Sequence, residues 1–381
     1  MVSFLATMNM IQPKQRMSRR RFIGKISTAF KVVLAAQFLP QMVRAAADTG
    51  GTAAALHYRP LTGDVLREMA RRKMHHGPDI FLNPMGIPRN KRFRQVLSWK
   101  LFHKNAYGDF LDDQPLLPVT IDWEPVKAHR GVSITFIKHS TLLIKDVDRV
   151  LLIDPVFNDI FWFIKDFTPL AFNLNEMPRP DHVLITHGHY DHLDHQSLGL
   201  LDQGTHVISP LGYDSEFKAA GISNRTRLDW YEYYSDGDRE ITLLPANHWT
   251  MRNPIIGPNR SLWGGYMIKT AGGPSIYISG DSAYFDGFEQ LANDYNIDLA
   301  IFNLGAYAPR WLMAPSHMNP AETVQAFQEI KARQLMIAHW GTFQLGDEPV
   351  HFPPADLRQA LDEKRLLSRW IELGHGQTHF F

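Results

Sequence analysis

The sequence has no cysteine among its 381 residues. A chain without cysteine can form neither a disulfide framework nor a metal site with thiolate ligands. It also lacks an internal repeat of short period and any low-complexity tract, which excludes a repeat array. The hydrophobic content of 44% and the charged content of 21% are ordinary for a globular protein. At this length we expect one large α/β domain with additions.

Acidic residues are missing from the first 47 residues, which carry eight Lys and Arg. Within them, Ser18–Lys25 (SRRRFIGK) precedes a moderately apolar stretch, Ile26–Val43, and a small-residue site. This order resembles a twin-arginine export signal, so we expect a periplasmic protein or one associated with the cell envelope. A basic amphipathic helix or an uncleaved anchor would have a similar composition. A lysine and a proline in the apolar stretch disfavour a permanent spanning helix.

The signal also determines the charge of the rest of the chain. The whole chain has a net charge of +1, and removing residues 1–47 with their eight positive charges leaves 1 − 8 = −7. A protein of this charge is a poor candidate for broad nucleic-acid binding, so we expect no nucleic-acid partner.

Short β-type segments dominate the chain from about residue 130 onward. Many are fully apolar, which is typical of strands buried on both faces. Helical patterns lie between the later ones, at Asn319–Ala332 and Pro354–Lys364. We expect residues 48–127 to be an N-terminal extension that packs on a catalytic domain, residues 128–381. The predicted strands are Val132–Ile137, Thr141–Ile144, Val150–Ile153, Val183–Thr186, His206–Ser209, Ile241–Pro245, Tyr266–Thr270, Ile276–Ser279, Leu299–Leu304 and Leu335–Ala338.

The stretch Thr186–Asp194 (THGHYDHLD) concentrates three histidines and two aspartates directly after an apolar strand. Histidine and aspartate are good ligands for borderline divalent metals, and the end of a strand holds them rigidly. His187 and His189 can aim at one ion, and Asp191 and His192 can reach a second ion nearby. A histidine-rich surface turn is the alternative, but the density of the pattern favours a metal site.

Three further polar residues end apolar strands: His248, Asp281 and His339. Each alone could be a hydrogen-bonded core residue. Together with the first stretch they form four ligand groups in order along the chain. Because a carboxylate has two oxygens, Asp281 is the natural bridge between two ions.

These motifs resemble those of the metallo-β-lactamase superfamily. The resemblance implies an αββα sandwich with a dinuclear metal site at one edge between the sheets. It implies His187, His189 and His248 on the first metal, Asp191, His192 and His339 on the second, and Asp281 bridging them.

Longer motifs resemble the family of N-acylphosphatidylethanolamine-hydrolysing phospholipases D, from about Phe81 to the C-terminus. Lys138 stands before His139 where that family usually has Gly, and Ser-Ala-Tyr follows Asp281 in place of Thr-Gly-Tyr. Both departures bear on the substrate rather than on the metal. The similar motifs are Leu262–Gly265 (LWGG), Gly280–Phe285 (GDSAYF), Gly305–Met313 (GAYAPRWLM), Ser316–Pro320 (SHMNP), Ala338–Phe343 (AHWGTF) and Gly374–Gly376 (GHG).

The resemblance implies a zinc-dependent phosphodiesterase of the phospholipase D type. Two Zn²⁺ ions, or other divalent metals, would share a hydroxide that attacks the phosphodiester of N-acylated phosphatidylethanolamine or a related phospholipid. The products would be phosphatidic acid and an N-acylethanolamine. Asp191 and Asp281 would be catalytic as well as metal-binding. His317 and His375 would bind phosphate or help the leaving group, although hydrogen-bonded loop histidines would look the same.

An aromatic segment, residues 157–172, holds five Phe and one Trp where the family has a more polar, basic loop. It either completes the core or forms an apolar lip that meets a membrane surface or an acyl chain. On the second interpretation Phe161, Trp162 and Phe163 contact the lipid substrate, and the protein makes a peripheral membrane contact.

Other functions fit the same ligands. A lactonase or other carbonyl-ester hydrolase would use the metal site with a different pocket, and an envelope lipid-binding protein would not need catalysis. An RNA-processing phosphodiesterase is disfavoured by the charge of −7, and a di-iron oxygen-reducing enzyme by histidine at His189, where glutamate is typical. The sequence leaves the oligomeric state open, a homodimer included.

Overall fold

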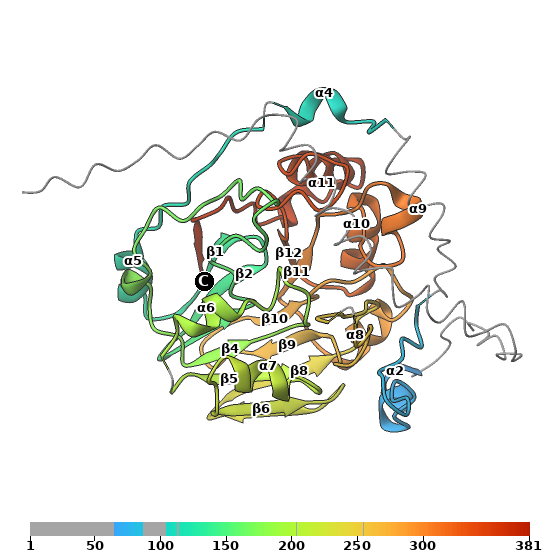
Figure 1. The fold of residues 1–381 in the computed structure, drawn as a ribbon. Coiled ribbons are helices and arrows are strands. Elements are labelled where there is room, and N and C mark those ends of the chain that lie inside the picture. Colours follow the sequence, from blue (N-terminus) through green and yellow to red (C-terminus); the bar gives the residue numbers. More distant parts are fainter. Residues whose placement is uncertain (1–64, 87–103, 113, 203, 254) are drawn as a thin grey trace, which may run out of the picture.

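The computed structural model describes residues 65–86, 104–112, 114–202, 204–253 and 255–381. The predicted export signal, residues 1–47, lies outside these ranges. No helix within them is long and apolar enough to cross a membrane. Figure 1 shows two β-sheets packed face to face with helices on their outer sides.

The first sheet has seven strands in the order β13-β1-β2-β3-β4-β5-β6. Strands β1, β2 and β3 are antiparallel, whereas β3 to β6 run parallel. The strands are β1 (Val132–Lys138), β2 (Thr141–Asp146), β3 (Arg149–Ile153), β4 (His182–Leu184), β5 (His206–Pro210), β6 (Arg225–Leu228) and β13 (Thr378–Phe380).

The second sheet has six strands in the order β12-β11-β10-β9-β8-β7. Here β10, β11 and β12 run parallel, and β7 to β10 are antiparallel. The strands are β7 (Tyr233–Asp236), β8 (Arg239–Leu244), β9 (Gly265–Lys269), β10 (Ser275–Ile278), β11 (Leu299–Asn303) and β12 (Gln334–Ala338).

Helices cover the outer face of each sheet. Trp123 of α5, Leu198 of α6 and Phe217 of α7 pack in one apolar cluster with the outward side chains of the first sheet. The main core lies between the sheets and continues to the helices on the second sheet. The helices are α2 (Val65–Arg71), α4 (Gly108–Leu111), α5 (Trp123–Ala128), α6 (His195–Gly199), α7 (Asp214–Ala219), α8 (Phe288–Asp294), α9 (Arg310–Met313), α10 (Pro320–Glu329) and α11 (Pro353–Glu363), with the short 3₁₀ helices η1 (Leu174–Glu176) and η2 (Leu367–Arg369).

Helix α10 shows how local sequence determines an element. The Asn319 side chain accepts a hydrogen bond from the Glu322 N–H, and the Glu322 carboxylate accepts one from the Asn319 N–H. Pro320 occupies the first turn, where a missing N–H costs nothing. Val324 and Phe327 then lie on the buried face. The helix therefore begins one residue after the start that the sequence predicts.

The fold class expected from the sequence is confirmed: two β-sheets pack face to face between outer helices, as an αββα sandwich. All ten predicted strands are present. Three strands were missed: β6, β7 and β13, each at an edge of its sheet. Their side chains are only partly buried, so they lack the apolar runs that identify the central strands.

The described parts of the N-terminal extension contact the core. Leu66 and Met69 of α2 belong to the main apolar cluster, and Val119 and Trp123 belong to the outer cluster of the first sheet. The boundaries at residues 47 and 127 stay predictions.

Candidate metal centre

The predicted ligands lie where strands of both sheets end. Residues 187–192 follow β4, His248 follows β8, Asp281 follows β10 and His339 follows β12. The chain turns sharply at these points: His339 has a φ of 69° and Gly280 a φ of 57°. A Cβ at Gly280 would lie 2.9 Å from the carbonyl oxygen of Gly264, so only glycine fits the turn that presents Asp281.

Four side chains form a first group, defined as His187, His189, His248 and Asp281. His187 Nε2 lies 2.9 Å and His248 Nε2 3.2 Å from His189 Nδ1. The same two Nε2 atoms each lie 3.7 Å from Asp281 Oδ2. Three imidazoles and one carboxylate thus face a common point, as in sites for borderline divalent cations.

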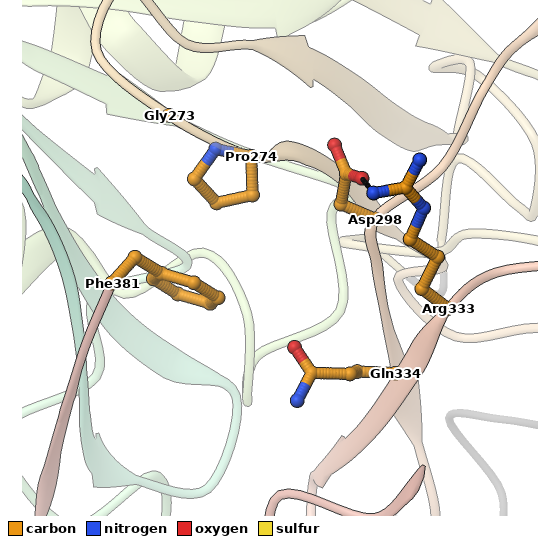
Figure 2. Close-up of a pocket in the computed structure, with 6 residues that line it drawn as sticks. All are labelled: Gly273, Pro274, Asp298, Arg333, Gln334 and Phe381. Carbon is orange, nitrogen blue, oxygen red and sulfur yellow. Dashed lines mark ion pairs between the residues drawn. The ribbon is translucent and has the colours of Figure 1, made fainter.

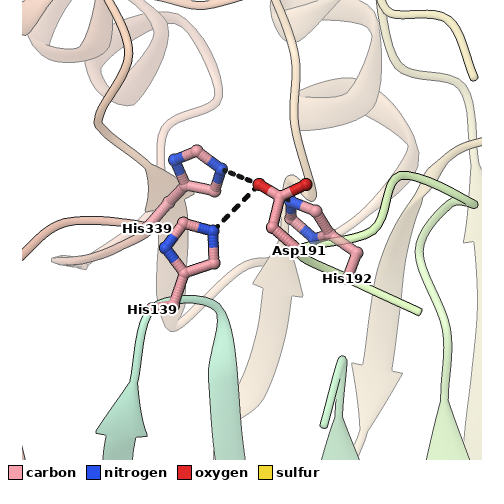
Figure 3. A group of neighbouring side chains, drawn as sticks. All are labelled: His139, Asp191, His192 and His339. Carbon is pink, nitrogen blue, oxygen red and sulfur yellow. Dashed lines mark hydrogen bonds and ion pairs between the residues drawn. The ribbon is translucent and has the colours of Figure 1, made fainter. Parts of the chain in front are cut away.

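Four others form a second group, defined as His139, Asp191, His192 and His339 (Figure 3). Asp191 Oδ2 lies 3.0 Å from His139 Nε2, 3.3 Å from His339 Nε2 and 3.5 Å from His192 Nε2.

Asp281 connects the two groups. Its Oδ2 lies 3.3 Å from His192 Nε2 and its Oδ1 lies 3.4 Å from His339 Nε2, in addition to its contacts in the first group. The structure therefore brings all seven predicted ligands together, with Asp281 between two sets. Their individual roles as ligands stay predictions.

His139 was not predicted as a member of either group. The signal was present in the sequence, because His139 follows the apolar strand β1 just as the other ligands follow theirs. Its φ of 49° also marks a sharp turn at that strand end. Its Nε2 approaches Asp191 at hydrogen-bond distance, so it either orients this carboxylate or adds a ligand.

A buried carboxylate outside both groups fixes the His192 ring. Asp154 is 1% exposed and accepts hydrogen bonds from Thr186 N at 2.7 Å and Thr186 Oγ1 at 2.6 Å. Its Oδ2 also lies 2.8 Å from His192 Nδ1. With the Nδ1 proton directed at Asp154, His192 turns its Nε2 toward the second group. Burial lowers the pKa of His192, but Asp281 and Asp191 outweigh it and raise that pKa well above the usual range, so a bound cation would take the place of the Nε2 proton.

Similar outer contacts hold other members. His248 Nδ1 lies 3.0 Å from the carbonyl oxygen of Ser316, which directs Nε2 inward. Asn303 Nδ2 donates to Asp281 Oδ1 at 2.9 Å.

The charges of the site favour a bound cation. Burial lowers the pKa of His187 well below its usual value and that of His139 to about 3, so both rings are neutral and able to bind metal. Burial raises the pKa of Asp281, but His339 and His192 outweigh it and hold that pKa well below the usual range. Among the described residues, the buried Nε2 atoms of His192 and His339 make no hydrogen bond. Ionised carboxylates facing imidazole nitrogens of this kind suit divalent metal ions.

His317 lies beside both groups. Its Nδ1 is 3.9 Å from Asp281 Oδ2, and its ring centroid is 5.4 Å from that of His248 and 5.7 Å from that of His339. Burial lowers the pKa of His317 to about 3. A neutral imidazole therefore stands next to the predicted bridge.

His375 lies behind the turn that carries His339. Its Nε2 is 3.0 Å from the carbonyl oxygen of Trp340, and its ring packs on Trp340 and Phe136 with centroids 4.4 and 4.7 Å away. It belongs to neither group.

The aromatic segment is partly core and partly exposed. Phe157 and Phe167 are buried, whereas the Trp162 side chain is 66% exposed. Phe161 stacks on Phe163 with centroids 5.3 Å apart. The Phe161 ring also lies 4.9 Å from Tyr190, the residue between His189 and Asp191 in the sequence. Residues 161–163 therefore adjoin the loop that carries the predicted ligands.

Lys138, which stands where the similar phospholipases D usually have Gly, connects the aromatic segment to the site. Lys138 is fully buried and forms an ion pair with Asp166. Phe167 N donates to the Thr342 carbonyl oxygen at 2.9 Å, just beyond the His339 turn. Lys138 is thus an anchor for the aromatic segment.

A hollow of about 430 Å³ lies away from this chemistry (Figure 2). It is lined by Phe381 and by residues at or just before the starts of β10, β11 and β12, whereas Asp281 and His339 follow the ends of β10 and β12. Its charged residues, Asp298 and Arg333, pair with each other at 3.3 Å.

Comparisons with known proteins agree with this geometry. A family model described as "Beta-lactamase superfamily domain" matches residues 149–340, about half of the chain. "N-acyl-phosphatidylethanolamine-hydrolyzing phospholipase D 1" of Caenorhabditis elegans is 29% identical over 330 residues, which cover 80% of this chain and 92% of that protein. "N-acyl-phosphatidylethanolamine-hydrolyzing phospholipase D, mitochondrial" of Saccharomyces cerevisiae is 31% identical over 211 residues, 52% of this chain and 45% of that protein.

A solved structure shows the same fold. The structure titled isothiocyanate hydrolase from Delia radicum gut bacteria superimposes with a TM-score of 0.55 at 19% identity, over 65% of this chain and 99% of that one. The family match, the shared fold and the two ligand groups lead to one conclusion: the chain belongs to the beta-lactamase superfamily and is a metal-dependent hydrolase.

Proposed function

We propose that the protein is a zinc-dependent phosphodiesterase of the phospholipase D type that acts on N-acylated phosphatidylethanolamine or a related phospholipid. The observation that carries the proposal is the alignment with the nematode phospholipase D over 92% of its length, combined with two ligand groups that Asp281 connects. The yeast alignment covers 45% of that protein and adds support for the central part only.

The chain's own residues divide the work at the site. His187, His189 and His248 would hold one ion, Asp191, His192 and His339 the other, and Asp281 would contact both. When bound, divalent ions would supply an activated water and would neutralise charge on the phosphoryl oxygens. Zinc is supported by the predicted ligand set of five imidazoles and two carboxylates, because imidazole suits this ion.

His317 would contact the substrate rather than the metal. Its ring lies beside Asp281, and its low pKa keeps it neutral, so it can donate one N–H to a phosphoryl or leaving-group oxygen. His375 contacts Trp340 behind the site, so its support of catalysis would act through the His339 turn.

An apolar rim supports a lipid substrate and a peripheral membrane contact. Trp162 is 66% exposed, and a second exposed pair, Ile255 at 94% and Ile256 at 56%, lies on a neighbouring turn. Tyr190 links the two: it packs on Phe161 and donates its hydroxyl hydrogen to the carbonyl oxygen of Arg252 at 2.6 Å. A two-tailed lipid does not readily leave its bilayer, because each buried CH₂ contributes about 0.8 kcal/mol. Aromatic and aliphatic side chains at the rim would bring the site to the lipid.

The location of the protein is part of the proposal. Export by residues 1–47 would place the protein in the periplasm or at the cell envelope, where phospholipid is accessible; this is supported by the sequence pattern alone. The remaining charge of 1 − 8 = −7 supports a partner other than nucleic acid.

Lipid mass spectrometry tests the function directly. Purified, zinc-loaded protein is incubated with mixed bacterial phospholipids that include N-acylated phosphatidylethanolamine. We expect phosphatidic acid and an N-acylethanolamine in equal amounts. Hydrolysis of a carbonyl ester or lactone without phosphodiester cleavage would establish the alternative hydrolase.

The rim is tested by changing Phe161, Trp162 and Phe163 to Ser together. We expect weaker liposome binding and slower turnover of vesicle substrate, with hydrolysis of a small soluble phosphodiester almost unchanged. Tyr233→Ser removes another exposed aromatic residue, on the edge strand β7, and serves as the control. Equal losses on both substrates with a lower melting temperature would show that the segment completes the core and does not bind lipid.

A further inference from the structure

A segment that precedes the catalytic domain is clasped to it by Asp229. This carboxylate lies 2.6 Å from Lys73 Nζ, 2.5 Å from His75 Nε2 and 2.8 Å from His76 Nε2. The His75 ring also stacks on Trp230 at 4.2 Å. These are hydrogen-bond distances, and the Lys73 ammonium already neutralises the charge of Asp229. The cluster is therefore a hydrogen-bonded clasp that holds the segment, rather than another metal site.

The chain after the clasp turns back along the catalytic domain. Leu82 N donates to the His75 carbonyl oxygen at 2.8 Å, and Phe81 N donates to the Asn259 carbonyl oxygen at 2.7 Å. This places Asn83 behind the loop that carries His248. The segment lies outside residues 149–340, the part that matches the family.

The Asn83 side-chain amide makes hydrogen bonds through both its oxygen and its nitrogen. Its Oδ1 accepts from Met85 N at 3.1 Å and from Gly86 N at 3.0 Å. Its Nδ2 donates to Asn247 Oδ1 and to the carbonyl oxygen of His248, both at 2.9 Å. Because two backbone N–H groups identify the oxygen, the orientation of the amide is determined by its partners.

The contacts of Asn83 continue to the loop of the predicted bridging carboxylate. Asn247 is 5% exposed, and its Nδ2 donates to the carbonyl oxygen of Tyr284 at 3.2 Å, three residues beyond Asp281. His248 is 1% exposed. One amide group from outside the family domain thus supports the backbone of His248 directly and the Asp281 loop through Asn247.

We propose that Asn83 is a positioning residue that holds His248 in place for metal binding. The proposal rests on the metal centre of the proposed function. The hydrogen bond from His248 Nδ1 to Ser316 sets the ring, and Asn83 sets the backbone on which the ring is carried. Loss of such an outer contact weakens metal affinity by about 10- to 100-fold.

The test is Asn83→Asp, which keeps the shape and the two acceptor contacts and removes both donor contacts. Asn224→Asp is the matched control, because Asn224 Nδ2 donates at 3.0 Å to the Gly204 carbonyl oxygen at an exposed position. We measure zinc affinity by chelator competition and record the visible spectrum of the cobalt-loaded protein. Asn83→Asp is expected to lose about 10- to 100-fold in affinity and to shift the cobalt bands, with Asn224→Asp unchanged.

The outcomes separate this inference from the proposed function. Metal binding by the native chain, together with unchanged affinity and spectrum in Asn83→Asp, would overturn the positioning role alone. Failure of the native chain to bind metal would overturn the proposed function itself. Asn83→Ser, whose side chain is too short to reach His248, is the second variant. If neither variant folds, Asn83 serves the whole fold and the positioning role is wrong.

Discussion

Replacing Asp154 by Asn should weaken metal binding without weakening the fold. Asp154 accepts from Thr186 N and Oγ1 and from His192 Nδ1. An amide keeps one acceptor, and its NH₂ then faces His192 Nδ1. The imidazole responds by moving its proton to Nε2, so an N–H points into the second group where a lone pair is needed.

The size of the effect follows from two independent considerations. A lost hydrogen bond to a charged group costs about 1.5–3 kcal/mol. Loss of an outer contact to a metal-binding histidine weakens affinity by about 10- to 100-fold, which corresponds to about 1.4–2.7 kcal/mol. In the metal-free protein the lost hydrogen bond is offset, because burial raises the pKa of Asp154 and the neutral amide avoids the cost of a buried charge.

Calorimetric zinc titration and thermal unfolding of the metal-free protein measure the two quantities separately. Asp194→Asn is the control, because the Asp194 carboxylate accepts from Ser197 N at 2.9 Å and Ser197 Oγ at 2.6 Å, and none of its hydrogen bonds within the described residues involves a histidine. Unchanged zinc affinity in Asp154→Asn, or an equal loss in Asp194→Asn, would refute the tautomer argument.

Three further changes test other parts of the molecule. Asp281→Asn removes the shared carboxylate, so turnover of a synthetic phosphodiester should fall by orders of magnitude while the circular dichroism spectrum is retained; near-native turnover with lost metal would contradict the mechanism. Burial raises the pKa of Glu348 from 4.5 to about 7. A raised folded-state pKa gives stability that is complete below pH 4.5 and is lost as the pH rises through 7, by up to about 3 kcal/mol. Denaturant unfolding of metal-free Glu348→Gln should lack this decline. Arg19→Lys with Arg20→Lys should leave a full-length precursor in the cytoplasm, and normal export, followed by immunoblot of cell fractions, would argue against the twin-arginine signal.

The sequence was sufficient for the central strands and for the polar residues that gather where these strands end. Strands such as β1 and β11 are buried along their whole length, so their apolar runs are visible without any partner. The ligands follow such runs directly. A buried polar side chain at the end of a strand is costly without a binding partner, so its position in the sequence indicates a functional role.

The edge strands β6, β7 and β13 could not be recognised in this way. An edge strand is paired on one side only and faces solvent, so its residues need not be apolar. In β7 the side chains are exposed or only partly buried, and β13 pairs with β1 from the far end of the chain. Such pairing depends on contacts that no short window of sequence contains.

The sequence by itself determined that histidines and aspartates would gather at strand ends, because each strand and its turn are local features. Only the tertiary structure decided how these ends meet. It brought His139 to Asp191 across 52 positions, set Asp154 against His192, and placed Asn83 behind His248 across 165 positions. These contacts arise because two buried sheets pack face to face and bring distant turns to one edge. A carboxylate or an amide that is buried at this edge needs a hydrogen-bond partner, and the fold supplies that partner from a distant part of the chain.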